Sequence, residues 1–151
     1  GRMTAHGTRA SGGPRAVGDA MPPMVRRVTQ VDIDRYADAT GDLNPIHVDP
    51  DYAATGPFGK TIGHGLMTLA YAAEMLNRWT GGRFDEVGEI EVTFIGPVFV
   101  EDTIRLGAEV TDILQNGTAV CALTCTAGDR RILVGTVRLP NQDNKEANHG
   151  A

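Results

Sequence analysis

The spacing of apolar residues changes once along this chain, and that change limits the folds open to it. Residues Gly65–Trp79 are apolar on almost every side over three turns, and Gly81-Gly82 follows. A helix without a polar face is a buried helix. After it, apolar and polar residues alternate, as in antiparallel strands with one solvent-facing side. These β-rich runs are 89–94, 103–111, 118–126 and 131–139. The order predicts an α+β fold in which an antiparallel sheet wraps around one long helix.

Smaller elements are expected ahead of the buried helix, where Gly and Pro mark the breaks between them. In order, they are a strand at Met24–Thr29, a helix at Val31–Thr40 ended by Gly41, a loop at Gly41–Pro50, a short helix near Asp51–Thr55 and a loop at Gly56–Gly63.

Both ends of the chain lack apolar periodicity. Residues 1–20 are rich in Gly, Ala, Arg and Thr, and residues 141–151 are polar. We therefore expect disordered tails on either side of a single domain at 21–140. The opening Gly1-Arg2-Met3 is typical of a tag remnant ahead of a native methionine.

Charge and composition argue against several classes of protein. The net charge of −5 does not suit a nucleic-acid-binding protein with a basic face. No apolar run approaches the roughly 18 residues of a membrane-spanning helix. Cys121 and Cys125 would lie about 13 Å apart on one face of a strand, too far for a disulfide, whose Cα atoms lie within about 7 Å. This spacing indicates a reducing, cytoplasmic compartment.

The side chains best suited to chemistry lie in the string Gly-Asp-Leu-Asn-Pro-Ile-His-Val-Asp at 41–49. Pro45 restricts its own backbone and that of Asn44, so the loop is stiff. It carries the Asp42 carboxylate and the His47 imidazole five positions apart. Such a pair can hold one water molecule, one group orienting it while the other accepts its proton. The same string is also good turn chemistry, so a purely structural role stays open.

His64 is the other histidine in the body of the domain. One interpretation makes it a residue at a helix N-terminus that bonds to backbone. Asp42, His47 and His64 together offer three metal ligands, but they lack the tight spacing of zinc motifs. We therefore expect no metal at this site.

The string at 41–47 resembles the signature of the MaoC-like and (R)-specific enoyl-CoA hydratases. The resemblance covers about Val17–Pro140, and its further matches are Gly18-Asp19, His64-Gly65 and Gly96–Val100 ahead of Asp102-Thr103. It implies the hotdog fold, an antiparallel sheet wrapped around a long helix, and an activity on acyl thioesters.

The resemblance also implies a role for each site residue. Asp42 and His47 match a catalytic pair that activates water for addition at C3 of a trans-2-enoyl thioester and then supplies a proton to C2. Asn44 orients the loop, and His64 supports the site. Gly65 donates its backbone N–H to the thioester oxygen, which suits the free N–H groups and positive dipole end of a helix N-terminus.

The expected reaction is reversible syn hydration to an (R)-3-hydroxyacyl thioester. It needs no metal or redox cofactor, and coenzyme A or an acyl carrier protein would carry the substrate. A homodimer is expected because free sheet edges invite pairing, and the resemblance implies sites at the subunit interface.

Two other functions stay open: a thioesterase on the same fold, and a non-catalytic acyl-CoA-binding subunit. The presence of both Asp42 and His47 argues against the second. Two positions depart from the pattern of the family, Ala73 where some members have Ser and Glu101 where Gly is common. The loss of the Ser hydroxyl means that support for the site must come from elsewhere, whereas Glu101 is expected to alter only a surface turn.

Overall fold

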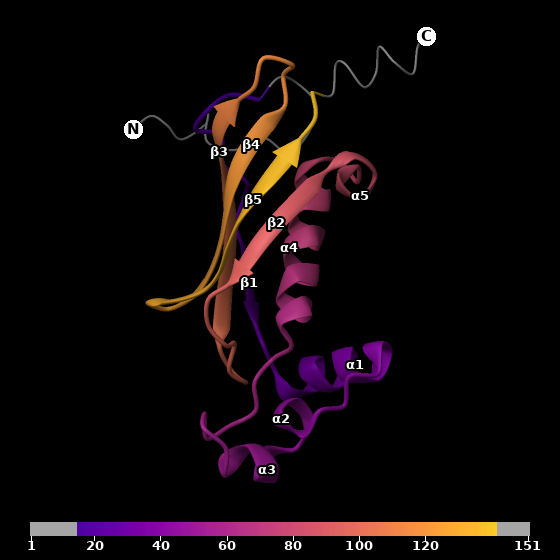
Figure 1. Cartoon of the computed structure of the whole chain (residues 1–151), viewed down its shortest axis with the longest axis vertical. Coiled ribbons are helices and arrows are strands. Elements are labelled where there is room, and N and C mark those ends of the chain that lie inside the picture. Colours follow the sequence, from indigo (N-terminus) through magenta and orange to yellow (C-terminus); the bar gives the residue numbers. More distant parts are fainter. Residues whose placement is uncertain (1–14, 142–151) are drawn as a thin grey trace.

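In the computed structural model, an antiparallel sheet curves around one long helix, which packs against a single face of it (Figure 1). The structure describes residues 15–141. The elements in chain order are β1 (Met24–Arg27), α1 (Gln30–Thr40), α2 (Pro45–Val48), α3 (Pro50–Ala54), α4 (Gly65–Trp79), α5 (Phe84–Val87), β2 (Glu89–Phe94), β3 (Thr103–Ile113), β4 (Ala119–Ala127) and β5 (Arg130–Leu139). The α+β arrangement expected from the sequence is confirmed.

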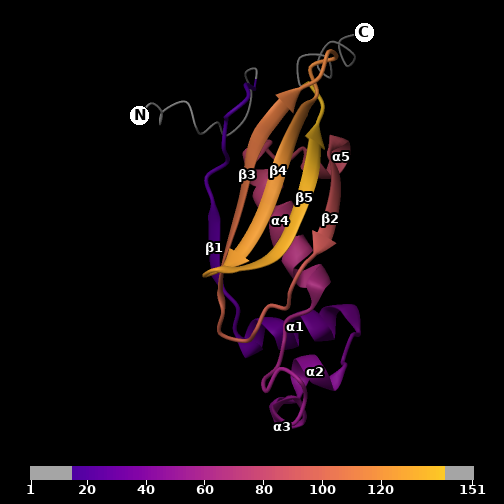
Figure 2. The ribbon, with the colours of Figure 1, turned by 60° about the vertical axis from the view of Figure 1, so that its left-hand side comes forward.

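The five strands lie in the order β1-β3-β4-β5-β2, and every neighbouring pair is antiparallel. The two shortest strands, β1 and β2, therefore form opposite edges of the sheet (Figure 2). The long strands β3, β4 and β5 form its middle, and the turn at 128–129 joins β4 to β5 as expected.

The hydrophobic core lies between α4 and the concave face of the sheet. Alternate residues of β3 are buried, from Ile104 to Val110, because successive side chains of a strand point to opposite faces. On α4 the buried side chains include Met67, Leu76 and Trp79. Each such side chain contributes about 1.5–3 kcal/mol relative to an exposed one. This core fixes α4 on the sheet and with it the position of the helix N-terminus.

Three features of α4 and its neighbours differ from the sequence-based expectation. Helix α4 is buried on one side only, since Leu66 is 61% exposed and Arg78 is exposed as well. The four-residue helices α2 and α5 were not expected, because one turn is too short to show a period. The third strand also runs on to Ile113 through a register shift after Val110.

The expected N-terminal boundary at residue 21 was placed too late. Gly18 donates to the carbonyl of Val110, the Val110 N–H donates to the carbonyl of Asp19, and Ala20 bridges to Glu109. Asp19 is 2% exposed. The chain therefore joins the sheet edge several residues before β1. Of the tails expected at 1–20 and 141–151, residues 1–14, with the tag remnant, and residues 142–151 lie outside the described residues.

Glu101 stands in an exposed turn before β3 with a φ of 73°. This left-handed backbone conformation costs an ordinary residue roughly 1–2 kcal/mol and costs glycine nothing. Glycine is therefore the unstrained choice at this position. The Glu101 carboxylate pairs with the guanidinium of Arg27.

Both cysteines are unpaired and buried in β4. No helix among residues 15–141 has the length and apolar character needed to cross a membrane.

Burial raises the pKa of Cys121 to about 11 and that of Cys125 to about 12. Both thiols are therefore protonated at pH 8, where the thiolate is the reactive form. We predict that the folded protein reacts negligibly with a thiol-specific disulfide reagent at pH 8, whereas two thiols react once guanidinium unfolds it. Rapid reaction of either thiol in the folded protein would contradict the burial described here.

The same shift gives the stability of the fold a pH dependence. The unfolded thiols ionise near pH 9 and the folded ones do not, so the free energy of unfolding should decrease as the pH rises from about 9 towards 11.

Candidate active site

The site forms where α1, α2 and α3 gather beyond the N-terminal end of α4 (Figure 1). Helix α1 begins with a capping box between Thr29 and Asp32. It ends at Gly41, whose φ of 80° is the left-handed conformation of a helix C-cap, and the Gly41 N–H donates to the carbonyl of Ala37 at 2.8 Å. The chain turns there, so Asp42 follows directly from a fixed helix end.

Helix α2 then brings His47 back toward Asp42. The Asn44 side chain caps this helix by accepting the N–H of Ile46 at 3.1 Å, and Pro45 occupies its first turn. The Asn44 N–H also lies 3.4 Å from Oδ1 of Asp42. Asn44 therefore contacts the loop on both sides, through its side chain to the Ile46 N–H and through its own N–H to the Asp42 carboxylate.

His47 is 8% exposed and is held from two directions. Its Nδ1–H donates to the carbonyl of Ile62 at 2.8 Å. Because that partner can only accept, neutral His47 keeps a free lone pair on Nε2. On the backbone side, the Gln30 side-chain amide donates to the carbonyl of His47 at 2.8 Å, and Thr61 donates to the amide oxygen of Gln30 at 2.6 Å.

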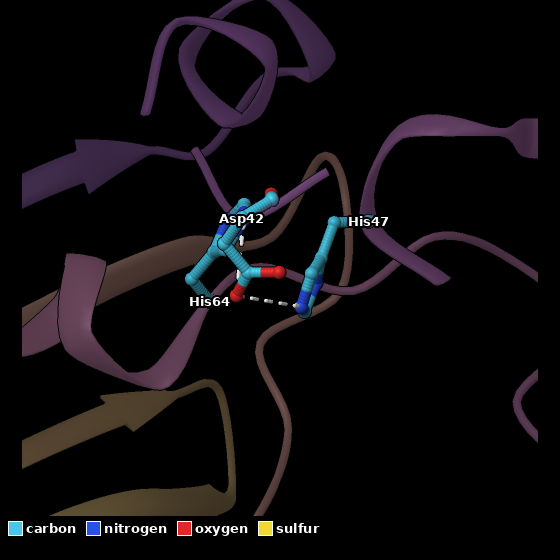
Figure 3. Close-up of side chains that lie close together, drawn as sticks. All are labelled: Asp42, His47 and His64. Atoms are coloured by element: carbon cyan, nitrogen blue, oxygen red, sulfur yellow. Dashed lines mark hydrogen bonds and ion pairs between the residues drawn. The ribbon is translucent and has the colours of Figure 1, made fainter. Parts of the chain in front are cut away.

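The two histidines and the aspartate meet at one point (Figure 3). Oδ2 of Asp42 lies 3.9 Å from Nε2 of His47 and 3.9 Å from Nε2 of His64. The imidazole rings stack with centroids 3.8 Å apart and planes 25° from parallel. A separation of 3.9 Å is too long for a direct hydrogen bond, but a water molecule about 2.8 Å from each atom fits it. The Asp42 side chain is 53% exposed, so such a water can be reached from solvent.

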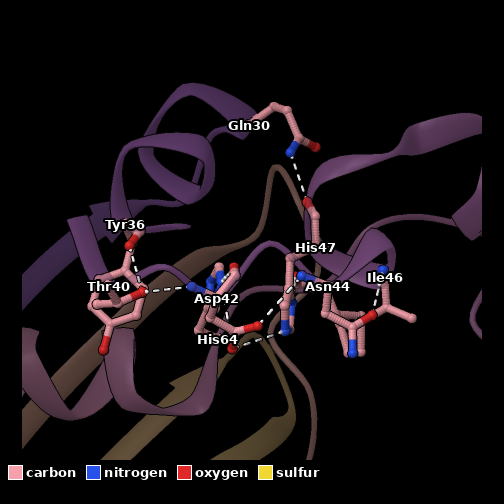
Figure 4. A network of polar contacts seen from close by, with 9 residues as sticks. Gln30, Tyr36, Thr40, Asp42, Asn44, Ile46, His47 and His64 are labelled. Atoms are coloured by element: carbon pink, nitrogen blue, oxygen red, sulfur yellow. Dashed lines mark hydrogen bonds and ion pairs between the residues drawn. The ribbon is translucent and has the colours of Figure 1, made fainter. Parts of the chain in front are cut away.

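His64 precedes the first residue of α4 but does not cap that helix with its side chain. Its ring instead crosses to the loop, where Nε2–H donates to the backbone carbonyl of Asp42 at 3.1 Å (Figure 4). The ring of Tyr36 packs against it at 4.9 Å. Nδ1 of His64 is buried without a partner among the described residues. The bond to backbone expected for His64 exists, but it ties α4 to the Asp42 loop.

Gly65 is the first residue of α4, so its N–H has no acceptor within the helix. The ring of Phe94, at the end of β2, lies 3.3 Å from where a Cβ on Gly65 would stand. Ala73, which stands where some members of the family have Ser, is partly buried against the core. The described residues do hold one buried, unpartnered hydroxyl on α4, that of Thr68.

The same three side chains are the candidate metal ligands among residues 15–141, with one ligand atom each within 4.8 Å of the others. Their geometry does not suit an ion. An imidazole nitrogen binds a metal in its own ring plane at about 2.0–2.1 Å, and two nearly parallel stacked rings do not direct their lone pairs to one point. Nε2 of His64 is also engaged with the Asp42 carbonyl.

Several residues that position the site were not singled out from the sequence. Gln30 and Thr61 hold the backbone of His47, Tyr36 packs on His64, and the Thr40 hydroxyl lies 3.4 Å from the Asp42 N–H. Of these, Tyr36 could have been found from the helical spacing that it shares with Ile33 and Ala37. Gln30 and Thr61 act through contacts between segments distant in sequence, whereas Thr40 contacts Asp42 only two residues away.

Comparison with known proteins gives consistent matches. The family model described as MaoC like domain matches residues 17–128. The 3-hydroxybutyryl-CoA dehydratase of Methylorubrum extorquens is 31% identical over 127 residues, 80% of this chain and 78% of that protein. The 3-hydroxyacyl-thioester dehydratase Z of Mycobacterium tuberculosis is 37% identical over 105 residues, 66% and 70% of the two chains.

Among solved structures, the (R)-hydratase from A. caviae superposes with a TM-score of 0.71 at 26% identity. The superposition covers 83% of this chain and 97% of that one. The hotdog arrangement expected from the sequence is thereby confirmed.

Proposed function

Because the chain belongs to the MaoC-like domain family, we propose that it is a hydro-lyase that interconverts trans-2-enoyl thioesters and (R)-3-hydroxyacyl thioesters. The relatives at 31% and 37% identity are named as dehydratases of 3-hydroxyacyl substrates. The observation that carries the proposal for this chain is the free Nε2 of His47 facing the Asp42 carboxylate at 3.9 Å.

In the hydration direction, a water held between the pair loses a proton to Nε2 of His47 while Oδ2 of Asp42 orients it. The water oxygen bonds to C3, and the C2–C3 π electrons move onto the thioester as an enolate. The pair then returns one proton to C2, so the net change is addition of one water. Both new bonds form on the face presented to the pair, which makes the addition syn. The reaction transfers no electrons and therefore needs no redox cofactor.

The enolate oxygen requires a donor, and the N-terminus of α4 is the proposed source. His64, whose ring stacks on His47, immediately precedes Gly65. The Gly65 N–H therefore lies next to the pair, at the positive end of the dipole of α4. A donor fixed in place before the reaction stabilises developing charge without reorganisation. Coenzyme A is the proposed carrier of the acyl group, and an acyl carrier protein is the alternative.

We further propose that the active form is a homodimer with cytoplasmic location. Strand β2 is a free edge, and Phe94 and Ile95 at its end are each 46% exposed. Leu66, beside Gly65, is 61% exposed. Pairing of this edge with a second copy would cover apolar surface next to the site.

The catalytic pair is tested by substitutions that keep side-chain size and polarity. We predict that Asp42→Asn and His47→Gln each lower kcat by about 10²–10⁴, the usual contribution of a general acid–base group. Because both groups act on one water, the double variant should be little slower than the slower single variant. If both single variants retain near-normal turnover while their melting temperatures drop, the loop has only a structural role.

The proposed oxyanion donor is tested by a matched pair at residue 65. Gly65→Pro removes the N–H at a helix position that accepts proline, and His64 already has the extended backbone that a following proline needs. Gly65→Ala keeps the N–H and adds the same close contact with Phe94. We predict a loss of about 10²–10³ in kcat for the proline variant beyond that of the alanine variant. Equal losses would assign the effect to packing against Phe94.

The assembly is tested by light scattering, which should give about twice the 16.1 kDa chain mass. We predict that Ile95→Lys dissociates the dimer because it places a charge in the buried apolar surface. Val25→Lys, on the opposite edge at β1 and 55% exposed, should leave the mass unchanged. An active wild-type monomer would exclude an interface site.

A further inference from the structure

A pocket adjoins the His47 loop on the side of α3. Its volume is about 340 Å³ and its lining is mostly apolar, within the range of about 300–1,000 Å³ typical of ligand sites. Ile46 and Ile62 form the end of this pocket nearest the site: Ile46 precedes His47, and the Ile62 carbonyl accepts the His47 Nδ1–H. Two lining residues of the pocket therefore adjoin His47 directly, one along the chain and one through a hydrogen bond.

Two aromatic side chains of this pocket face solvent. Tyr52 is 53% exposed and Phe58 is 47% exposed. Large apolar rings that are exposed beside a pocket are typical of a binding surface. Their flat faces suit a planar ring system, because stacking on an aromatic side chain accepts any nucleobase.

Positive charge lies next to these rings. Lys60 lines the pocket, and its ammonium lies 5.0 Å from the ring centroid of Phe99. The guanidinium of Arg130 lies 4.7 Å from the same centroid, and Phe99 packs edge-on against Phe58 at 5.8 Å. Arg130 is already paired with Asp102. Lys60 forms no ion pair with any carboxylate whose side chain the structure describes, so its charge is available to a ligand.

We propose that this pocket binds the nucleotide end of a coenzyme A thioester, with the adenine ring stacked on Tyr52 or Phe58 and the phosphates facing Lys60. The inference rests on the proposed function, and it names coenzyme A as the carrier. A purely apolar occupant, such as the acyl chain, would leave the Lys60 charge without a role. A nucleoside bisphosphate uses both the open aromatic rings and the unpaired ammonium. The pantetheine arm then leads from this pocket past Ile46 and Ile62 to the catalytic pair.

Direct binding is the first test, with adenosine 3′,5′-bisphosphate as the probe and calorimetry on the whole protein. Tyr52→Ala removes a stacking face and Lys60→Met removes the charge, and each should weaken binding at least about fivefold. The matched variants Tyr52→Phe and Lys60→Arg keep the ring and the charge, and should bind within about twofold of wild type. Failure of the wild-type protein to bind the bisphosphate, or equal binding by all variants, overturns the proposal.

Kinetics provide the second test, with one enoyl group carried on coenzyme A or on pantetheine. Lys60→Met and Tyr52→Ala should lower kcat/KM at least about fivefold for the coenzyme A thioester and leave that of the pantetheine thioester unchanged. Equal losses on both carriers, or a change in acyl chain-length preference instead, would overturn the proposal. If the wild type hydrates neither thioester yet binds the bisphosphate at this pocket, the proposed reaction fails and the nucleotide site stands.

Discussion

The hydrogen bond from His47 Nδ1 to the carbonyl of Ile62 connects the two halves of the site. It joins helix α2 to the segment that leads into α4, and the Ile62 N–H returns a bond to the carbonyl of Ile46. It also fixes which ring nitrogen of neutral His47 is free. The lone pair on Nε2 of His47 is therefore oriented without a carboxylate behind the imidazole, because the backbone carbonyl of Ile62 holds the ring in place.

The fold supplies what this bond requires. Segment 61–63 is itself anchored to the loop after β2, through bonds from Gly63 to Val98 and from Val100 to Thr61. The core beneath the sheet holds α4, and α4 holds His64 against His47. The exposed Asp42 carboxylate is the least restrained member, at 53% exposure. The imidazoles are therefore preorganised by the core, whereas the carboxylate is open to solvent.

Much of this arrangement could be predicted from local sequence. The switch from a helical run to alternating strands predicted the sheet and the bounds of Gly65–Trp79. The stiff Asn44-Pro45 loop predicted a pair formed by Asp42 and His47, which the structure places 3.9 Å apart. Helix α2 was missed although Asn followed by Pro is a helix-start signal, because four residues show no period. The stacking of His47 on His64 and the Gln30 contact to His47 join residues 17 apart, and no local pattern encodes them. Burial of α4 was overestimated because apolar Leu66 and Ala70 look like core in sequence, yet they face outward in the single chain.

Addition of water across an enoyl thioester removes its conjugation, so the absorbance of the conjugated enoyl thioester reports directly on the proposed reaction. With purified protein and short- to medium-chain enoyl-CoA, we predict a loss of this absorbance that stops at an equilibrium. The product should be the (R)-3-hydroxyacyl thioester, with no free thiol. Release of free coenzyme A would instead indicate a thioesterase on the same fold. An unchanged absorbance, with the protein folded and the substrate bound, would contradict the proposed hydratase activity.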